Sequence, residues 1–313
     1  MAEAALRIEG LTRHFGAITA VDDLSLEVEQ AEIFGLIGAD GAGKTTTMRL
    51  VCGLLRPDAG EIIVAGVSVR RQPEQARRRL GYLPQAFGLH NDLSIEENIR
   101  YFADLFCQDL SEIADLRDEL LAATGLTQFT ARMVGDLSGG MKQKSALICA
   151  LIHRPEVLLL DEPTRGVDPV SRRDLWRIVY DLPAEGVTVI VATPDADEAE
   201  RCSRLGVISE GAMVETGTPH ELIERHTSRL VEITAADQRA ARDLLREIDG
   251  VVGVSGIGGS LRVSLAEGGP GAGDLTDALE RAGHEVTEAG EVEPRLEDAL
   301  LALESRTARE ADG

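Results

Sequence analysis

Three short stretches of the chain are apolar or glycine at every position except Thr188, without the alternation of a half-exposed strand. They are residues 33–37, 157–160 and 187–191. Strands that are apolar on both faces are typical of a parallel sheet covered by helices on both sides. Helical stretches lie between them, and Ser94-Ile95-Glu96-Glu97 fits a capping box that predicts a helix over 94–106. The pattern predicts one α/β unit over residues 1–225.

The pattern changes near His226, where shorter elements follow one another. We expect strands at 229–234, 251–255 and 260–265, helices at 237–248 and 275–281, and a weak strand near 284–287. This order is that of a small α+β, ferredoxin-like unit. A last helix is expected from about Pro294, with one apolar face made by Leu296, Ala299, Leu300 and Leu303. The predicted domains are therefore 1–225 and 228–313.

Composition agrees with two globular domains and restricts the partners. The 313 residues are 43% hydrophobic, and 54 acidic against 32 basic residues give a net charge of −22. Nucleic acids and anionic lipid surfaces attract basic proteins, so we expect neither as a direct partner. The longest apolar run, 146–152, is too short to span a bilayer, and the N-terminus lacks the pattern of a signal peptide. Any membrane contact is expected to run through a protein partner.

The cysteines and lysines are both few. Cys52, Cys107, Cys149 and Cys202 are scattered without a Cys-x-x-Cys pair, which favours buried free thiols in a reducing cytoplasm. Only three of the 32 basic residues are lysines: Lys44, Lys142 and Lys144. Since lysine is a compact point charge and arginine a planar fork, a lysine in this arginine-rich chain suggests a specific anion site.

The first of these lysines lies in a complete phosphate-binding loop, or P-loop. Residues 38–45 match G-x-x-x-x-G-K-[ST], follow an apolar strand and precede a helical stretch. Backbone N–H groups and the helix N-terminus bind phosphate, the lysine reaches the β- and γ-phosphates, and the threonine can ligate Mg²⁺. The candidate nucleotide-binding residues of this loop are Gly38, Ala39, Asp40, Gly41, Ala42, Gly43, Lys44, Thr45 and Thr46.

Two acidic residues end the apolar run 157–160. Asp161 can hold Mg²⁺ through a water molecule, and Glu162 can polarise the attacking water. A second helix start, Ser138-Gly139-Gly140, offers another anion-binding N-terminus. One P-loop already surrounds its phosphates from one side, so this second site suggests contact with the nucleotide of another molecule.

Over residues 5–225 these motifs, in this order, resemble the nucleotide-binding subunits of ATP-binding cassette (ABC) transporters. Leu137–Met141 resembles the family signature, and residues 38–45 and 161–162 resemble its Walker A and Walker B motifs. The resemblance implies that Gln85 senses Mg²⁺ and the attacking water, that Phe15 stacks on adenine, and that Asp168 belongs to the D-loop. It implies ATP and Mg²⁺ as cofactors, with Thr45, Gln85 and Asp161 around the metal.

Finer features resemble the drug-exporter branch of this family, whose partners are separate integral membrane permeases. They are residues 87–94, 151–156 and, more weakly, 293–300. The resemblance implies a sandwich of two cassettes, as homodimer or heterodimer. It also implies a cytoplasmic position, peripheral on the inner face of the bacterial membrane through the permease.

Two positions depart from the family pattern. Ala39-Asp40 stands where Pro-Asn is commoner, and Pro194 stands where the switch histidine would contact the γ-phosphate. Proline has no side-chain donor. Locally, we expect Thr193 to be a helix N-cap with Pro194 in the first helical position.

The sequence thus predicts an ATP-hydrolysing export subunit. One alternative is a slow ATP-dependent clamp paired with a competent cassette, which Pro194 favours and Glu162 opposes. Another is a non-transport ABC ATPase of translation or DNA repair. The single cassette, the lack of a long coiled-coil insertion and the acidic charge all oppose that alternative.

Overall fold

The structure, a computed structural model, describes residues 4–86, 88–106, 108–109, 111–227, 229–266 and 268–311, without the side chains of 257 and 304–311. Contacts divide the chain into two compact units, Met1–Thr218 and Pro219–Gly313. Phe87 and Cys107, which entered the sequence predictions, lie outside the described residues. Cys52, Cys149 and Cys202 are buried free thiols, as predicted.

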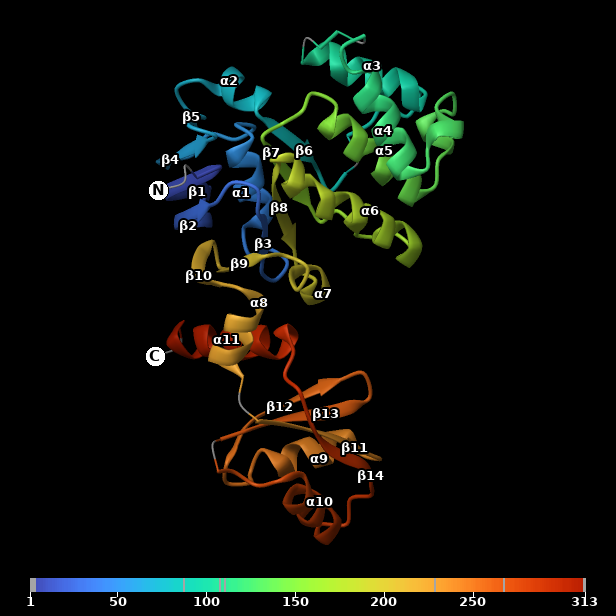
Figure 1. Ribbon diagram of the computed structural model, residues 1–313. Helices are drawn as coiled ribbons and strands as arrows, with labels where there is room; N and C mark the ends of the chain where they lie inside the picture. Colours follow the sequence, from blue (N-terminus) through green and yellow to red (C-terminus); the bar gives the residue numbers. More distant parts are fainter. Residues whose placement is uncertain are drawn as a thin grey trace. The chain divides into compact units, whose positions relative to one another are not determined.

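The first unit is built on a six-stranded sheet in the order β10-β9-β3-β8-β7-β6 (Figure 1). The strands run parallel except for β10, which pairs antiparallel with β9 at one edge. Every residue of β3, β7 and β8 is buried, which confirms the prediction from the three apolar runs. The strands are β3 (Ile33–Ile37), β6 (Leu80–Leu83), β7 (Val157–Asp161), β8 (Thr188–Thr193), β9 (Arg204–Ser209) and β10 (Ala212–Gly217).

A second, antiparallel sheet lies beside it in the order β2-β1-β4-β5. One hydrophobic core joins this sheet to helix α1 and strand β3, with Leu11, Phe34 and Met48 fully buried in it. Burial of these side chains fixes where α1 starts relative to the large sheet. The elements are β1 (Leu6–Phe15), β2 (Ile18–Val28), α1 (Lys44–Val51), β4 (Ala59–Val64) and β5 (Val67–Ser68).

Helices α3, α4 and α5 gather into a cluster at one side of the first unit (Figure 1). Ser94 caps α3 and exchanges hydrogen bonds with Glu97, so the predicted capping box is confirmed. The remaining helices are α2 (Pro73–Arg78), α3 (Ile95–Leu105), α4 (Ala114–Thr124), α5 (Gly139–Leu151), α6 (Pro169–Asp181) and α7 (Ala196–Ala199). Short 3₁₀ turns lie at η1 (Thr127–Phe129), η2 (Val134–Asp136) and η3 (Leu182–Glu185).

The second unit contains an antiparallel sheet in the order β12-β13-β11-β14. Helices α9 and α10 pack their apolar residues onto this sheet, which confirms the predicted ferredoxin-like order. Its elements are β11 (Arg229–Ala235), α9 (Gln238–Leu245), β12 (Val251–Ile257), β13 (Ser260–Leu265), α10 (Ala272–Arg281) and β14 (Val286–Val292). The last strand was expected near 284–287. It starts later and is longer because it pairs along most of β11.

Two further helices, α8 (Pro219–His226) and α11 (Leu296–Ala311), pack against each other within the second unit. Leu296, Ala299 and Leu303 of α11 are buried, as its predicted apolar face requires. Because of this packing, α8 belongs to the second unit by contacts, although the sequence placed 219–225 in the first domain. The boundary at 225–228 stays a prediction about folding units.

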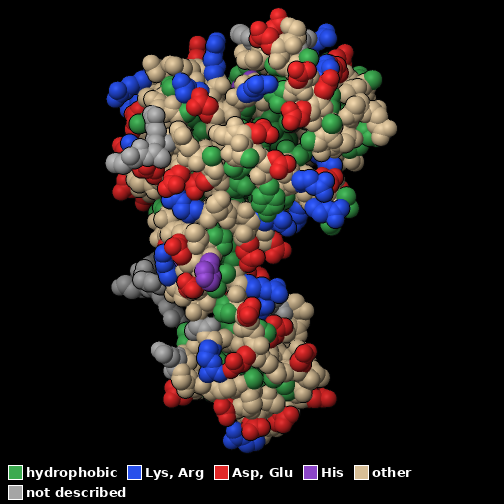
Figure 2. All heavy atoms as spheres, viewed as in Figure 1, with side chains coloured by type: hydrophobic (Ala, Val, Ile, Leu, Met, Phe, Trp, Pro, Cys, Tyr) green, Lys and Arg blue, Asp and Glu red, His purple; other side chains and the backbone are tan. Residues whose placement is uncertain are grey.

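Charged side chains are distributed over the outside of both units. Acidic and basic groups lie interspersed over the visible face of each unit (Figure 2). Among the described residues, no helix is both long enough and apolar enough to cross a membrane.

Candidate functional site

The P-loop connects β3 to α1, and its backbone can be formed only with glycine at two positions. A Cβ on Gly38 would lie 2.1 Å from the Ile208 carbonyl oxygen, and one on Gly43 would lie 2.5 Å from that of Ala20. Gly43 also has φ 106°, in the left-handed region. The backbones of strand β9 and of the β1–β2 hairpin therefore pack directly against the loop and leave no room for a side chain at these two positions.

Lys44 folds back over this loop. Its Nζ donates to the carbonyl oxygens of Gly38 at 2.7 Å and Ala39 at 2.8 Å. Burial lowers the pKa of Lys44, while the charges of Glu162, Asp40 and Asp161 raise it. The ammonium thus lies at the first two loop residues, where a phosphate oxygen offers it a stronger acceptor than a carbonyl.

The P-loop is joined to the end of β7 by one hydrogen bond. Thr45 Oγ1 donates to Asp161 Oδ1 at 2.9 Å, and Tyr82 donates to the other carboxylate oxygen at 3.3 Å. Asp161 is fully buried. Burial raises the pKa of its carboxyl, and the two hydroxyl donors only partly oppose that. The charge of Arg49 also opposes it, but within the described residues no cationic side chain is hydrogen-bonded to the carboxylate.

Glu162 has an unusual backbone conformation. Its φ of 50° is in the left-handed region, and its N–H donates to the Ala192 carbonyl at 2.8 Å. Such strain is common at functional sites. Its carboxylate accepts a hydrogen bond from Arg165 Nη1 at 2.7 Å and is only 9% exposed. Arg165 is a site residue that the sequence reasoning missed, although its i,i+3 spacing from Glu162 was visible in the sequence.

The segment after β8 differs from the expectation. Thr193 is the last residue of β8, and Asp195 is the N-cap of α7, so the prediction of Thr193 as N-cap is wrong. Thr193 Oγ1 instead donates to Glu198 at 2.6 Å and accepts from the Asp195 N–H at 3.0 Å. The reason is that the buried Glu198 carboxylate needs hydroxyl donors and takes them from Thr193 and Thr164.

Gln85 and Phe15 lie at the periphery. Gln85 is exposed and follows β6, which pairs in parallel with β7, so it lies at the same carboxyl edge of the sheet as Asp161. Phe15 ends β1 and is 44% exposed, and the Arg13 guanidinium lies 4.8 Å from its ring centroid. The hairpin that carries Phe15 leads to Ala20, whose carbonyl borders Gly43.

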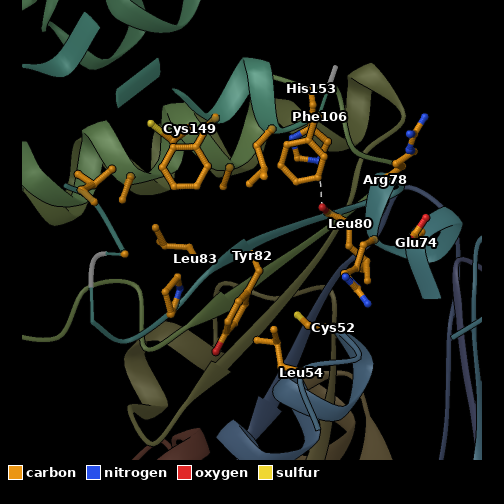
Figure 3. A pocket seen from close by; sticks show the side chains of 18 residues that line it. Cys52, Leu54, Glu74, Arg78, Leu80, Tyr82, Leu83, Phe106, Cys149 and His153 are labelled. Atoms are coloured by element: carbon orange, nitrogen blue, oxygen red, sulfur yellow. Dashed lines mark hydrogen bonds between the residues drawn. The ribbon is translucent and has the colours of Figure 1, made fainter. Parts of the chain in front are cut away.

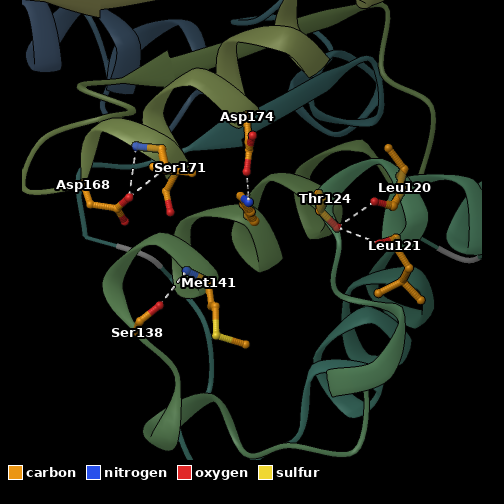
Figure 4. Close-up of polar contacts among 10 residues, drawn as sticks. Leu120, Leu121, Thr124, Ser138, Met141, Asp168, Ser171 and Asp174 are labelled. Atoms are coloured by element: carbon orange, nitrogen blue, oxygen red, sulfur yellow. Dashed lines mark hydrogen bonds and ion pairs between the residues drawn. The ribbon is translucent and has the colours of Figure 1, made fainter.

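The other predicted residues form a second cluster at two helix starts (Figure 4). Ser138 caps α5 by accepting from the Met141 N–H at 3.3 Å, and Asp168 caps α6 by accepting from Val170 at 3.1 Å and Ser171 at 3.0 Å. These bonds lower the pKa of Asp168, with that from Ser171 as the largest cause.

Close packing holds the two helix starts together. A Cβ on Gly140 would lie 2.2 Å from Ser171 Oγ, so only glycine fits between them. Within the described residues, no hydrogen bond or ion pair joins this second cluster to the P-loop.

A groove of about 560 Å³ opens between β6, α3 and α5 (Figure 3). It is lined mostly by apolar side chains, among them Leu80, Phe106 and Cys149, and it continues to Pro84, the neighbour of Gln85. His153 stacks on Phe106 at 3.7 Å, and its Nε2 lies 2.9 Å from the Leu80 carbonyl oxygen, which requires Nε2 to carry the proton. Burial lowers the pKa of His153. Sequence reasoning did not find this groove, because its walls come from distant segments.

Residues 21–165 match the model of a protein family described as ABC transporter. The chain is 39% identical over 247 residues to the Nod factor export ATP-binding protein I of Paraburkholderia xenovorans, covering 78% of this chain and 81% of that protein. It is also 39% identical over 220 residues to the probable multidrug ABC transporter ATP-binding protein YbhF of Escherichia coli. That match covers 70% of this chain but only 38% of YbhF, so the chain spans about two fifths of that relative's length.

Solved structures agree on the fold. A structure described as the ATP binding subunit of an ABC transporter superposes with a TM-score of 0.66 at 28% identity, covering 71% of this chain and 92% of that one. The ATP-binding cassette MJ0796, solved as a dimer bound to ADP and Pi, has a TM-score of 0.62 at 24% identity and covers 68% and 98%. At that identity, the second likeness concerns the fold alone.

Proposed function

The chain belongs to the ABC transporter family, and from that premise we propose that it is the ATP-binding and ATP-hydrolysing subunit of an exporter. The observation that carries the proposal is the 2.9 Å hydrogen bond between Thr45 and Asp161. It joins the P-loop to the acidic end of β7 across 116 residues of sequence and leaves Glu162 beside them. The residues proposed to bind phosphate and to activate water therefore lie at the same edge of the sheet.

The chain's own groups have separate roles at the phosphates. The loop amides, the N-terminus of α1 and Lys44 bind the β- and γ-phosphates. Glu162 orients a water and accepts its proton as the water oxygen bonds to the γ-phosphorus. The bond from that phosphorus to the bridging oxygen breaks, and ADP and phosphate result. Gln85 and Phe15 are proposed to contact the water and the adenine.

Thr45 and Asp161 fit a magnesium site, with Gln85 as a third ligand. Mg²⁺ in nucleotide sites is commonly held by one or two carboxylates together with substrate phosphates. The fit rests on the Asp161 carboxylate, which is fully buried and whose hydrogen bonds, in the part of the chain that the structure describes, come from two hydroxyls. When bound, the ion would neutralise charge that develops on the phosphate oxygens.

We propose two protein partners. A second cassette would bring its own Ser138–Gly140 helix start to the phosphates held here, because within this chain no described hydrogen bond joins that cluster to the P-loop. An integral membrane permease is supported by the export and multidrug names of the relatives and by the groove of Figure 3. An apolar segment of the permease in that groove would lie next to Pro84 and Gln85. The chain would then lie on the inner face of the membrane through the permease.

A second candidate function is a slow clamp that binds ATP well and hydrolyses it poorly beside a competent cassette. The observation in its favour is that the segment after β8 provides no free side-chain donor. Pro194 has none, and the Thr193 hydroxyl donates to Glu198. Pro194→His tests this candidate: a clear rise in turnover at saturating ATP supports it, and ordinary turnover in both proteins contradicts it.

The proposed function is tested by reconstituting the chain with its cognate permease and measuring phosphate release from ATP. We expect Mg²⁺-dependent release that increases with the permease and that Lys44→Ala lowers by about tenfold or more, because a charge-assisted contact to phosphate is lost. Calorimetry should show weaker ATP binding by the same variant. Equal ATP affinity in both proteins would refute the P-loop assignment, and permease-independent turnover would refute the export role.

A further inference from the structure

Arg165 lies in the segment between the acidic end of β7 and α6. Its side chain forms a hydrogen bond with Glu162 although it is mostly exposed to solvent. Its Nη1 donates to Glu162 Oε2 at 2.7 Å, yet its side chain remains 58% exposed. A guanidinium has five N–H donors. Among the described residues, no other acceptor is bonded to it, so most of its donors stay available beside the proposed catalytic carboxylate.

The charge of Arg165 also acts on the P-loop. It is one of the causes that lower the pKa of Lys44, and the pKa of Arg165 itself is raised first by Glu162 and also by Asp40 of the loop. The guanidinium therefore acts electrostatically on Asp40, Lys44 and Glu162 together. Asp40 and Lys44 belong to the P-loop, and Glu162 directly follows Asp161, which is hydrogen-bonded to Thr45 of the same loop.

The end of β8 provides no side-chain donor for the terminal phosphate. Proline at 194 carries no donor, and the hydroxyl of Thr193 already donates to Glu198. Lys44 approaches the phosphates from the loop itself. On the side of Glu162, Arg165 is the cationic side chain that the described structure bonds to that carboxylate.

We propose that Arg165 is a ligand of the terminal phosphate of bound ATP and, through its bond to Glu162, positions that carboxylate toward the same phosphate. The inference rests on the proposed ATP site. It makes Arg165 a selective sensor of the γ-phosphate, because ADP lacks the group that the guanidinium would contact. Arginine suits this task, since its planar fork can contact a carboxylate and a phosphate with different N–H groups.

An opposite reading of the same contact gives a different outcome. If Arg165 only sequesters the Glu162 carboxylate, its removal frees the base and increases turnover. If it is an ordinary surface ion pair, its removal changes little, because exposed pairs contribute weakly. The experiment therefore compares binding and turnover.

Binding is measured by calorimetry with ATP and ADP in the Glu162→Gln background, where ATP is consumed slowly. We expect Arg165→Ala to weaken ATP binding by about tenfold and to leave ADP binding within about twofold, since a charge-assisted contact to phosphate is lost. Arg165→Lys should be intermediate. Arg172→Ala is the matched control, because Arg172 pairs with Asp195 at 3.3 Å and its removal costs the same charge.

In the otherwise unchanged protein, Arg165→Ala should lower turnover by about tenfold, and adding Pro194→His should recover part of it by supplying a donor from the other side. Higher turnover in Arg165→Ala, an equal loss for ATP and ADP, or no loss for either would each overturn the inference. A Glu162→Gln parent that binds neither nucleotide would instead overturn the proposed function, and this inference with it.

Discussion

Each unit of the molecule buries a carboxylate, but the two are satisfied differently. Asp161 of the first unit is fully buried, and its hydrogen bonds within the described residues come from the neutral hydroxyls of Thr45 and Tyr82. Asp298 of the second unit is 8% exposed and accepts from Arg262 Nη1 at 2.7 Å and from the Arg295 N–H at 2.8 Å. Among the described residues, no cationic side chain is hydrogen-bonded to the first carboxylate, whereas the second accepts a hydrogen bond from a guanidinium.

This difference separates a binding site from a structural contact. A buried charge without a partner costs stability unless a ligand compensates for it, so Asp161 fits a site completed by a cation and nucleotide. Asp298 is already neutralised, and its contact with Arg262 connects α11 to the sheet through β13. The nearby Glu232 belongs to the same network: Ser260 donates to it at 2.7 Å, and this bond is the largest cause that lowers its pKa.

The largest effect is expected from breaking the compensated pair. Asp298→Ala leaves the buried Arg262 guanidinium without its closest counterion, which typically costs about 3–5 kcal/mol. We expect α11 and β13 to lose hydrogen-exchange protection by that amount, measured by mass spectrometry on the full chain. Asp277→Ala, an exposed carboxylate on α10, is the control. Adding Arg262→Met should restore part of the protection, and no recovery would contradict the pairing argument.

The next effect concerns the acidic end of β7. Glu162→Gln should slow turnover by roughly 100-fold or more, since general-base catalysis is typically worth 10²–10⁴. ATP affinity should be retained, because the P-loop contacts are unchanged. Phosphate release and calorimetry measure the two quantities, with Glu156→Gln as an exposed control just before β7. A Gln variant with unchanged turnover removes Glu162 from the base role.

A smaller effect of opposite sign is expected at Asp161. The pKa of its carboxyl is raised in the folded chain, so nucleotide-free protein loses stability as pH rises from the unfolded pKa through the folded one. Asp161→Asn removes this cost and keeps an acceptor for Thr45. We expect the nucleotide-free variant to melt a few degrees higher at neutral pH, an effect on the order of 1 kcal/mol, and to lose most Mg²⁺-dependent stabilisation by ATP.

The melting temperature of Asp161→Asn should also depend less on pH above about 4, the usual pKa of an aspartate, than that of the unchanged protein. Thr124→Val is the control for removal of a buried polar group that is fully hydrogen-bonded. Thr124 Oγ1 donates to the carbonyl oxygens of Leu120 and Leu121 within α4 (Figure 4), so its replacement should not raise the melting temperature. An Asn variant that melts lower would show that Asp161 is already compensated.

The smallest effect is expected from removing the second unit. Every proposed nucleotide contact lies before Thr218, so deletion of 219–313 should change ATP affinity by no more than about twofold. Calorimetry on the shortened chain, checked for folding by circular dichroism, measures this. A folded shortened chain that cannot bind ATP would show that the second unit contributes to the site.

Much of the fold and part of the site followed from the sequence. The three apolar runs predicted the buried strands β3, β7 and β8, because strands buried on both faces are nearly continuous in apolar residues. The P-loop was predictable residue by residue, since Gly43 and Lys44 act through local backbone geometry. The capping box at Ser94 was predictable for the same reason. In the second unit, the alternation of short elements predicted the ferredoxin-like order.

The misses have a common cause in partners that are distant along the chain. Thr193 looked like an N-cap because its neighbours in sequence allow it, but the buried Glu198 recruits its hydroxyl and Asp195 caps α7 instead. β14 was predicted too short because its length is set by pairing with β11. The apolar groove beside Gln85 could not be predicted from the sequence, because α3, α5 and β6 each contribute a part of its wall.

By itself, the sequence determined what depends on neighbours within a few residues: the burial of strands, the helix starts, the glycines of the P-loop and the order of motifs. Tertiary structure alone decided which charges meet. Asp161 is 116 residues from Thr45, and Arg262 is 36 residues from Asp298. Whether a buried carboxylate finds a guanidinium or only hydroxyls depends on the packing of separate elements, and that decides whether it stabilises the fold or remains available for a ligand.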